Sequence, residues 1–192
     1  MKNTIPADMI KDIKRAIILD PNDPQNYIDR GQFYQALKKY EYAEKDFNKA
    51  VTLAPKDAKV YEKRGDFYKQ IGNNALALEN YNQMIKLNPN IDNYKKRIEL
   101  YKEMENYKNA IKDYTTLIKF EPKNKLLYFE RAESYINIKD FNNALKDAEK
   151  VIALDSKDYS GYFMRANVYI CQGEYEKACL THLTFRQVFL LH

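Results

Sequence analysis

The sequence predicts an all-α fold, a right-handed α-solenoid of about 11 helices arranged as antiparallel pairs. Three observations predict it. A Tyr-x-x-Arg-x-x-x-Tyr signature occurs five times, and its arginines are 34, 33, 34 and 34 residues apart. An alanine follows the second tyrosine of every copy by nine residues, and proline closes most of the units. A period of this length is typical of helical units that stack on their neighbours.

The first helix of each unit carries the signature. Its three residues lie at i, i+3 and i+7, so they share one face of an α-helix. We interpret them as structural residues, and the five copies are Tyr27/Arg30/Tyr34, Tyr61/Arg64/Tyr68, Tyr94/Arg97/Tyr101, Tyr128/Arg131/Tyr135 and Tyr162/Arg165/Tyr169. A small residue follows the arginine in four copies, which allows a neighbouring helix to approach closely: Gly31, Gly65, Ala132 and Ala166.

The second helix of each unit begins near the recurring alanine. These structural alanines are Ala43, Ala77, Ala110, Ala144 and Ala178. Apolar residues follow them at intervals of three and four, so the second helix is amphipathic. Turn formers such as Gly72 and Asn73 separate the two helices in most copies. A proline such as Pro55 then ends the unit, because proline cannot continue a helix.

The repeat predicts the organisation of the chain. Residues 1–22 form a partial repeat with a single helix, because Ile13, Ala16 and Leu19 fall where later units have the apolar residues of their second helix. This helix starts near Pro6, which suits a first helical turn. The array covers residues 24–179, as units 24–57, 58–90, 91–124, 125–158 and the start of 159–192.

Residues 180–192 form a tail with a different composition. It contains none of the lysine, asparagine, tyrosine and acidic residues that crowd the rest of the chain, and it holds both histidines. Two interpretations remain open: a divergent last helix, or foreign sequence that replaces a longer array. An apolar end of a solenoid predicts self-association or a missing partner, through Val188, Phe189, Leu190 and Leu191.

The pattern resembles the tetratricopeptide repeat, over roughly residues 6 to 180. In the first unit, the residues that occupy the family's conserved slots are Tyr27, Gly31, Tyr34, Ala43, Phe47, Ala50 and Pro55. The chain departs from the family by using tyrosine in place of its tryptophan and arginine in place of its commoner leucine. The resemblance implies a scaffold that binds a protein segment in a concave groove lined by the first helices.

That resemblance also assigns groove positions to the first helices, off their packing stripe. In the third unit these positions include Lys95 and Lys102, among mixed charges. In the last two units they are apolar, and the predicted groove residues there are Leu126, Phe129, Ile136, Phe163 and Ile170. We expect these to seat the apolar side chains of a peptide or helix. Burial under a neighbouring helix or the tail is the other interpretation of the same residues.

Chaperone-binding members of the family hold a carboxylate with a lysine and an asparagine in two groove slots. Those slots here read Ile28/Gln32, Glu62/Asp66, Lys95/Glu99, Phe129/Glu133 and Phe163/Asn167. No unit matches, so we do not expect a carboxylate-clamp chaperone ligand.

The arginine of the signature has a predicted partner. Sixteen residues after it, three units carry an aspartate on the second helix. Partly buried arginine favours planar, hydrogen-bonded pairing with a carboxylate. We therefore predict the pairs Arg30–Asp46, Arg97–Asp113 and Arg131–Asp147.

Composition narrows the class of function. The formal charge is +5, and a solvated helical surface explains it better than a nucleic-acid patch. The sequence shows no phosphate-binding glycine loop, nucleophile motif or metal-ligand spacing, so we expect no catalysis, metal or cofactor. We expect no membrane span either, and two cysteines favour a reducing, cytoplasmic location. The leading prediction is a non-enzymatic scaffold for a protein or peptide partner. The alternatives are a helical-repeat nucleic-acid binder and a fragment without independent activity.

Overall fold

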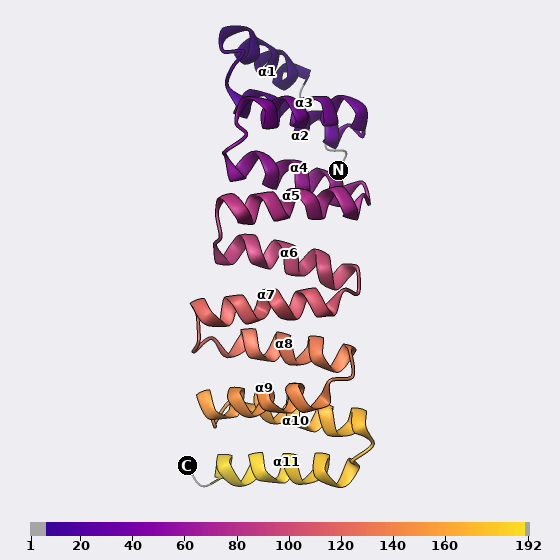
Figure 1. Ribbon diagram of the computed structural model, residues 1–192, viewed down its shortest axis with the longest axis vertical. Coiled ribbons are helices and arrows are strands. Elements are labelled where there is room, and N and C mark those ends of the chain that lie inside the picture. Colours follow the sequence, from indigo (N-terminus) through magenta and orange to yellow (C-terminus); the bar gives the residue numbers. More distant parts are fainter. Residues whose placement is uncertain (1–6, 191–192) are drawn as a thin grey trace. The chain divides into compact units, whose positions relative to one another are not determined.

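The computed structural model describes residues 7–190, with side chains from 8 to 187, and this part of the chain consists of α-helices without a strand (Figure 1). The prediction of an all-α fold with about 11 helices is confirmed. In chain order the helices are α1 (Ala7–Leu19), α2 (Pro24–Ala36), α3 (Tyr40–Leu53), α4 (Ala58–Gln70), α5 (Asn74–Leu87), α6 (Ile91–Glu103), α7 (Tyr107–Phe120), α8 (Lys125–Asn137), α9 (Phe141–Leu154), α10 (Tyr159–Gln172) and α11 (Tyr175–Leu190).

The helix starts follow from short polar side chains at the N-caps. Asp23, Asp57, Asn124 and Asp158 each accept a hydrogen bond from the backbone N–H two residues later, at the starts of α2, α4, α8 and α10. This bond satisfies one of the donors that a helix start leaves unpaired. Pro6, at the predicted start of the first helix, lies outside the described residues.

The turns between paired helices use the left-handed region of backbone space. Gly72 and Gly173 adopt φ of 78° and 79° there. Lys38, Glu105 and Lys139 occupy the equivalent place in the other turns, with φ of 58°, 54° and 60°. A side chain in this region costs on the order of 1 kcal/mol relative to glycine, so the packing of the two helices holds these turns.

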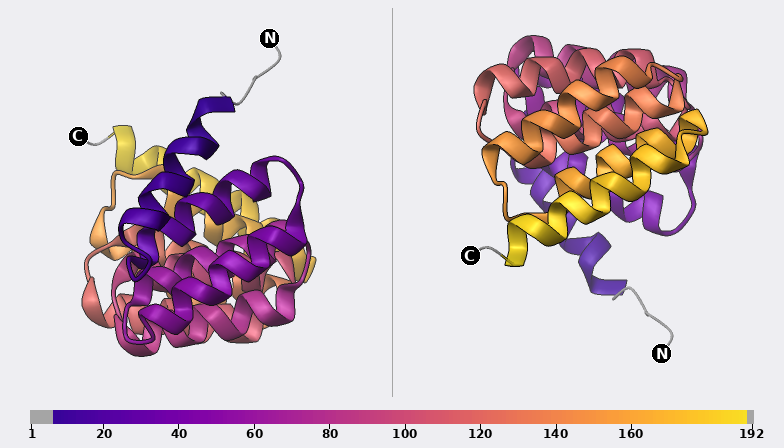
Figure 2. Two further views of the ribbon diagram at one scale, coloured as in Figure 1. Left: turned by 90° about the horizontal axis from the view of Figure 1, so that it is seen from above. Right: turned by 90° about the horizontal axis from the view of Figure 1, so that it is seen from below.

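The described chain divides into two compact units, residues 1–93 and 94–192. In the first unit α1 packs on α2, α2 pairs with α3, and α4 pairs with α5. In the second, α7 packs on α8, α8 pairs with α9, α9 packs on α10, and α10 pairs with α11. Figure 2 shows α10 and α11 side by side at the C-terminal end.

The recurring alanines lie at the centre of the helix pairs. Ala43, Ala77, Ala110 and Ala144 are fully buried, and Ala178 is 8% exposed. Because alanine is small, it lets the two helices of a pair come together while larger residues fill the layers on either side. In the first unit that filling includes Phe47 and Phe67, whose ring centroids are 5.2 Å apart.

The C-terminal tail continues the last helix to Leu190. Phe185 holds this helix to α10, because its ring centroid lies 5.0 Å from that of Tyr159 and 5.2 Å from that of Tyr162. The tail therefore packs as a second helix through residue 187. The side chains of 188–190 and residues 191–192 lie outside the described part, so self-association through Val188, Phe189, Leu190 and Leu191 stays a prediction.

Candidate functional site

The arginine of the signature is bound as predicted. Arg30, Arg97 and Arg131 each donate two hydrogen bonds to the partner aspartate, Nε at 2.8 Å and Nη2 at 2.7 Å. The aspartate side chains are nearly buried, at 6–7% exposed. These bidentate bonds join the two helices of a unit, and they account for arginine at this position.

The tyrosines of the signature enclose the same guanidinium group. The Cζ of Arg131 lies 5.7 Å from the ring centroid of Tyr128 and 5.8 Å from that of Tyr135. The Tyr128 hydroxyl donates to the carbonyl of Pro122 at 3.0 Å, and Tyr27 and Tyr61 do the same to Pro21 and Pro55. Each unit is thereby fastened to the proline that ends the unit before it. The signature is a structural device rather than a binding site.

Three neighbouring depressions lie on α6, α8 and α10 in the second compact unit, on the surface we call the helix-A surface. Lys95, Lys102 and Leu126 line the first, of about 320 Å³. Lys102, Ile136 and Asn167 line the second, of about 280 Å³. Phe163, Asn167 and Ile170 belong to the third, of about 610 Å³, which α11 completes. Shared lining by Lys102 and Asn167 makes the three depressions adjoin.

Six of the seven predicted groove residues line these depressions. Leu126, Phe163 and Ile170 are the most open, at 57%, 48% and 50% exposed. Lys95 is exposed as well, while Lys102 and Ile136 are half-buried. Phe129 is half-buried and packs against a cluster that includes Ala132 and Met164, as the burial interpretation predicts for such a residue.

The central part of the helix-A surface is acidic and partly dry. Burial raises the pKa of Glu133, and the positive charge of Lys102 opposes that shift. On the neighbouring helix α7, the buried hydroxyl of Tyr114 donates a hydrogen bond to the Glu130 carboxylate. Burial, aided by this bond, raises the pKa of Tyr114. A bound segment would therefore meet fixed carboxylates at the centre and an apolar groove toward α11.

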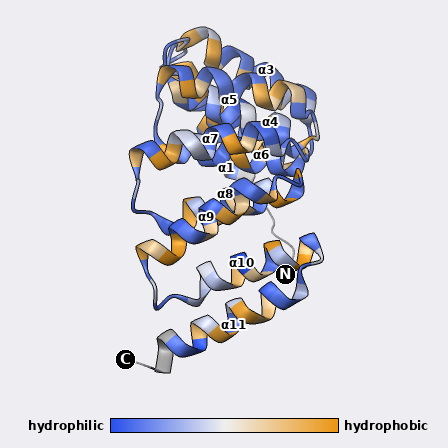
Figure 3. Cartoon of the chain, turned by 60° about the horizontal axis from the view of Figure 1, so that its bottom comes forward, coloured by the Kyte–Doolittle hydropathy of each residue, from blue (hydrophilic) through white to orange (hydrophobic). Residues whose placement is uncertain are grey.

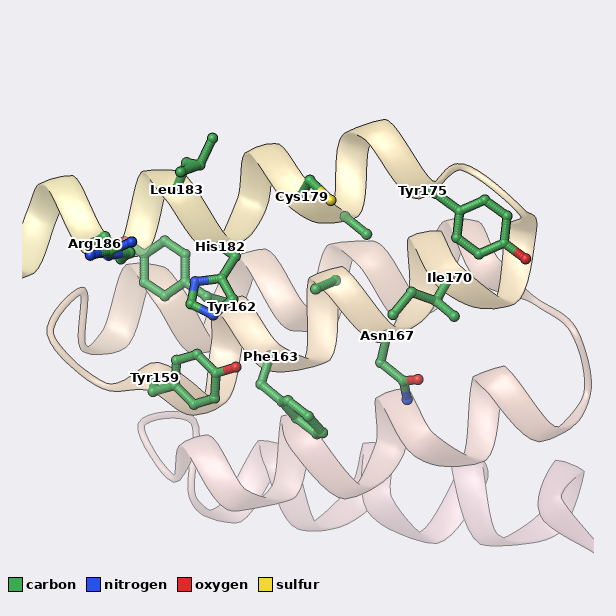
Figure 4. Close-up of a pocket in the computed structure, with 12 residues that line it drawn as sticks. Tyr159, Tyr162, Phe163, Asn167, Ile170, Tyr175, Cys179, His182, Leu183 and Arg186 are labelled. Carbon is green, nitrogen blue, oxygen red and sulfur yellow. The ribbon is translucent and has the colours of Figure 1, made fainter.

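The third depression also contains residues that the sequence did not single out. Tyr159 on α10 and Tyr175, Cys179, His182, Leu183 and Arg186 on α11 line it together with the predicted residues (Figure 4). The groove positions came from the first helices alone, so residues of the second helix were missed. The signal was present, because no further copy of the signature follows Tyr169 to cover them.

Other chemistry is absent from the described part of the chain. No group of three or more histidine, cysteine or acidic residues is placed to hold a metal ion there. Cys171 and Cys179 are free and exposed. None of the described helices is long and apolar enough to cross a membrane.

Fold and site together define a helical-repeat protein with an open, side-chain-lined surface. The chain belongs to the tetratricopeptide repeat family, whose profile matches residues 24–57, 58–91, 99–124 and 127–158. Repeats of this family form protein-interaction scaffolds, and this chain has that architecture.

Solved structures agree on the fold. A crystal structure of MamA protein is 17% identical, with a TM-score of 0.65 over 87% of this chain and 92% of that chain. A crystal structure of YrrB, described as a TPR protein with an unusual peptide-binding site, is 17% identical, with a TM-score of 0.65 over 88% of each chain. MamA 41-end from Desulfovibrio magneticus RS-1 is 13% identical, with a TM-score of 0.63 over 86% of this chain and 94% of that chain. No curated protein matches the sequence.

Proposed function

We propose that this protein is a non-enzymatic scaffold that binds a protein segment along the helix-A surface of α6, α8 and α10. The observation that carries the proposal is the row of adjoining depressions there, which six independently predicted groove residues line. Exposed apolar side chains on a folded protein mark a place where another chain can bury them. The peptide-binding site in the description of YrrB is consistent with this use of the fold.

The proposed partner is a protein rather than nucleic acid. The described lining includes the carboxylates of Glu99, Glu103, Glu130 and Glu133 beside the two lysines. Acidic groups facing the bound segment repel phosphates, so the surface does not suit a nucleic-acid backbone. Two free, exposed thiols also fit a reducing, intracellular location.

An affinity-capture experiment tests the function. The variant Lys95→Glu with Leu126→Ala changes two exposed side chains of one depression, and a second variant combines Phe163→Ala with Ile170→Ala. Each is compared with the wild type by mass spectrometry of the captured proteins. We expect both to lose a specific protein partner, since buried anchors carry most of the binding energy.

The matched control changes the same residue types elsewhere. Lys150→Glu with Leu180→Ala alters an exposed lysine on α9 and a leucine on α11 that is 60% exposed. It should capture the partner as the wild type does. Equal capture by all four proteins, or capture of nucleic acid that salt releases, would remove the proposal.

A further inference from the structure

The groove between α8 and α9 is filled within this chain. Met164 and Val168 of α10 are 1% and 0% exposed, and they form one cluster with Ala132, Ala144 and Ala148. Half-buried side chains of α8 and α9 surround this cluster: Phe129, Tyr135, Ile136, Phe141 and Leu145. A helix with two apolar side chains four residues apart is therefore what this groove accepts.

The same groove recurs one repeat later, between α10 and α11, and stands open. Seven of its lining residues lie 34 positions after a member of the filled groove, namely Phe163, Ala166, Ile170, Tyr175, Ala178, Cys179 and His182. Tyr175 is 67% exposed, whereas its counterpart Phe141 is half-buried. In Figure 4 His182 points from α11 toward α10, into the space that α10 occupies in the earlier copy. Apolar residues recur along both helices in Figure 3.

One difference between the two grooves concerns charge. In the filled groove, Gly161 of α10 lies against Ile152, and a Cβ on that glycine would come within 2.7 Å of the Ile152 Cγ1. Arg186 stands 34 residues after Ile152. It is exposed and makes no hydrogen bond or ion pair with the residues that the structure describes. The open groove thus has room and positive charge where the filled one admits only glycine.

We propose that the α10–α11 groove binds an amphipathic α-helix of another protein. This helix carries two apolar side chains four residues apart, in the places of Met164 and Val168. It carries an acidic residue three positions before the first of them, in the place of Gly161, which faces Arg186. The proposal names the class of partner for one end of the helix-A surface, and so it rests on the proposed function.

The probe is a synthetic peptide of residues 158–172, because this segment already fills the equivalent groove. It carries a fluorescein label, and Cys171→Ser prevents a disulfide with Cys179. A second peptide adds Gly161→Glu, and a third replaces both Met164 and Val168 by aspartate. Binding to the full chain is followed by fluorescence anisotropy.

We expect saturable binding of the first peptide, about tenfold tighter binding of the Gly161→Glu peptide, and none of the third. The chain variant Arg186→Glu should cancel the tenfold gain and leave the first peptide within about twofold. The variant Phe163→Ala with Ile170→Ala should weaken both peptides about tenfold or more. Leu180→Glu, on the same helix but outside the groove, should change nothing.

Several results would overturn the proposal. One is the absence of saturable binding, and another is binding that neither Arg186→Glu nor the Phe163/Ile170 variant alters. Sedimentation that shows two copies occupying each other's grooves, with no displacement by peptide, would assign the surface to self-assembly instead. The Lys95→Glu and Leu126→Ala variant should bind the peptides normally. Failure of the peptides with intact partner capture would refute the helix and leave the scaffold function standing.

Discussion

At the scale of single residues, the arginine of the signature is the most constrained polar group. In the first, third and fourth copies it meets a nearly buried aspartate, and tyrosine rings cover its faces. In the second copy Arg64 meets Asn80 and also Asn48 of the preceding pair, at 2.8 Å and 2.9 Å. The natural exchange of aspartate for asparagine shows that one hydrogen bond at Nε is the minimum requirement.

The Arg131–Asp147 pair gives a graded prediction. Asp147→Ala leaves a buried guanidinium without its carboxylate and should lower the free energy of unfolding by about 3 kcal/mol. Asp147→Asn keeps one hydrogen bond, as Asn80 does for Arg64, and should cost about half as much. Urea denaturation measures both. The exposed Glu149→Ala on the same helix should stay within about 0.5 kcal/mol, and an equal effect of all three would show that the pair does not stabilise the fold.

At the scale of helices, residue sizes on facing helices compensate each other. Gly31 lies against the ring of Phe47, and Gly65 lies against the ring of Tyr81. In the fourth unit Ala132 belongs to the same cluster as Ala148, which is small where the others are aromatic. The distance between the two helices of a pair is therefore kept by large-with-small pairing rather than by one residue type.

Adding a methyl group at the two glycines should have different results. At Gly65 a Cβ would lie 2.7 Å from the Tyr81 Cε1, so Gly65→Ala should destabilise by about 1–3 kcal/mol through overpacking. At Gly31 the nearest atom is 3.2 Å away on Phe47. There the gain of about 1 kcal/mol in helix propensity should nearly cancel the strain in Gly31→Ala. Thermal unfolding compares the two, and equal shifts would contradict the crowding argument.

At the scale of the whole molecule, the last repeat departs from the others. Thr181 stands where three units have aspartate, and its hydroxyl donates to the backbone carbonyl of Lys177 instead. The Nε of Arg165 is buried without a hydrogen-bond partner among the described residues. Repeat arrays are stabilised mainly between neighbours, so this defect should weaken α10 and α11 locally.

Restoring the acid should repair the last repeat. Thr181→Asp gives Arg165 the partner that its equivalents have, and we expect about 1 kcal/mol of local stabilisation. Hydrogen exchange should show about fivefold greater protection in α10 and α11, with residues 7–93 unchanged. Thr184→Asp introduces the same charge on the exposed side of α11 and is the control. Equal protection in both variants would mean that net charge, and not the pair, is responsible.

The candidate site divides into a predictable part and an unpredictable part. Leu126, Phe163 and Ile170 could be placed because each repeat has the same positions facing outward, and the resemblance identified which ones. The exposure of Phe129 could not, because it depends on how deeply α10 sits in the groove that Met164 and Val168 fill. Likewise, the contribution of α11 to the open groove depends on the helix that is not there to cover it.

The sequence by itself determined the fold class, the helix pairs and the Arg–Asp partners. Each of these follows from a local period that five copies reinforce, and local periodicity survives in a linear pattern. Only the tertiary structure decided which apolar residues are covered and which stay open. Phe129 and Phe163 occupy the same place in successive repeats, yet one packs in a core cluster and the other lines a groove. The difference is the neighbouring helix, because burial depends on what lies against a side chain in space and not on its position in the repeat.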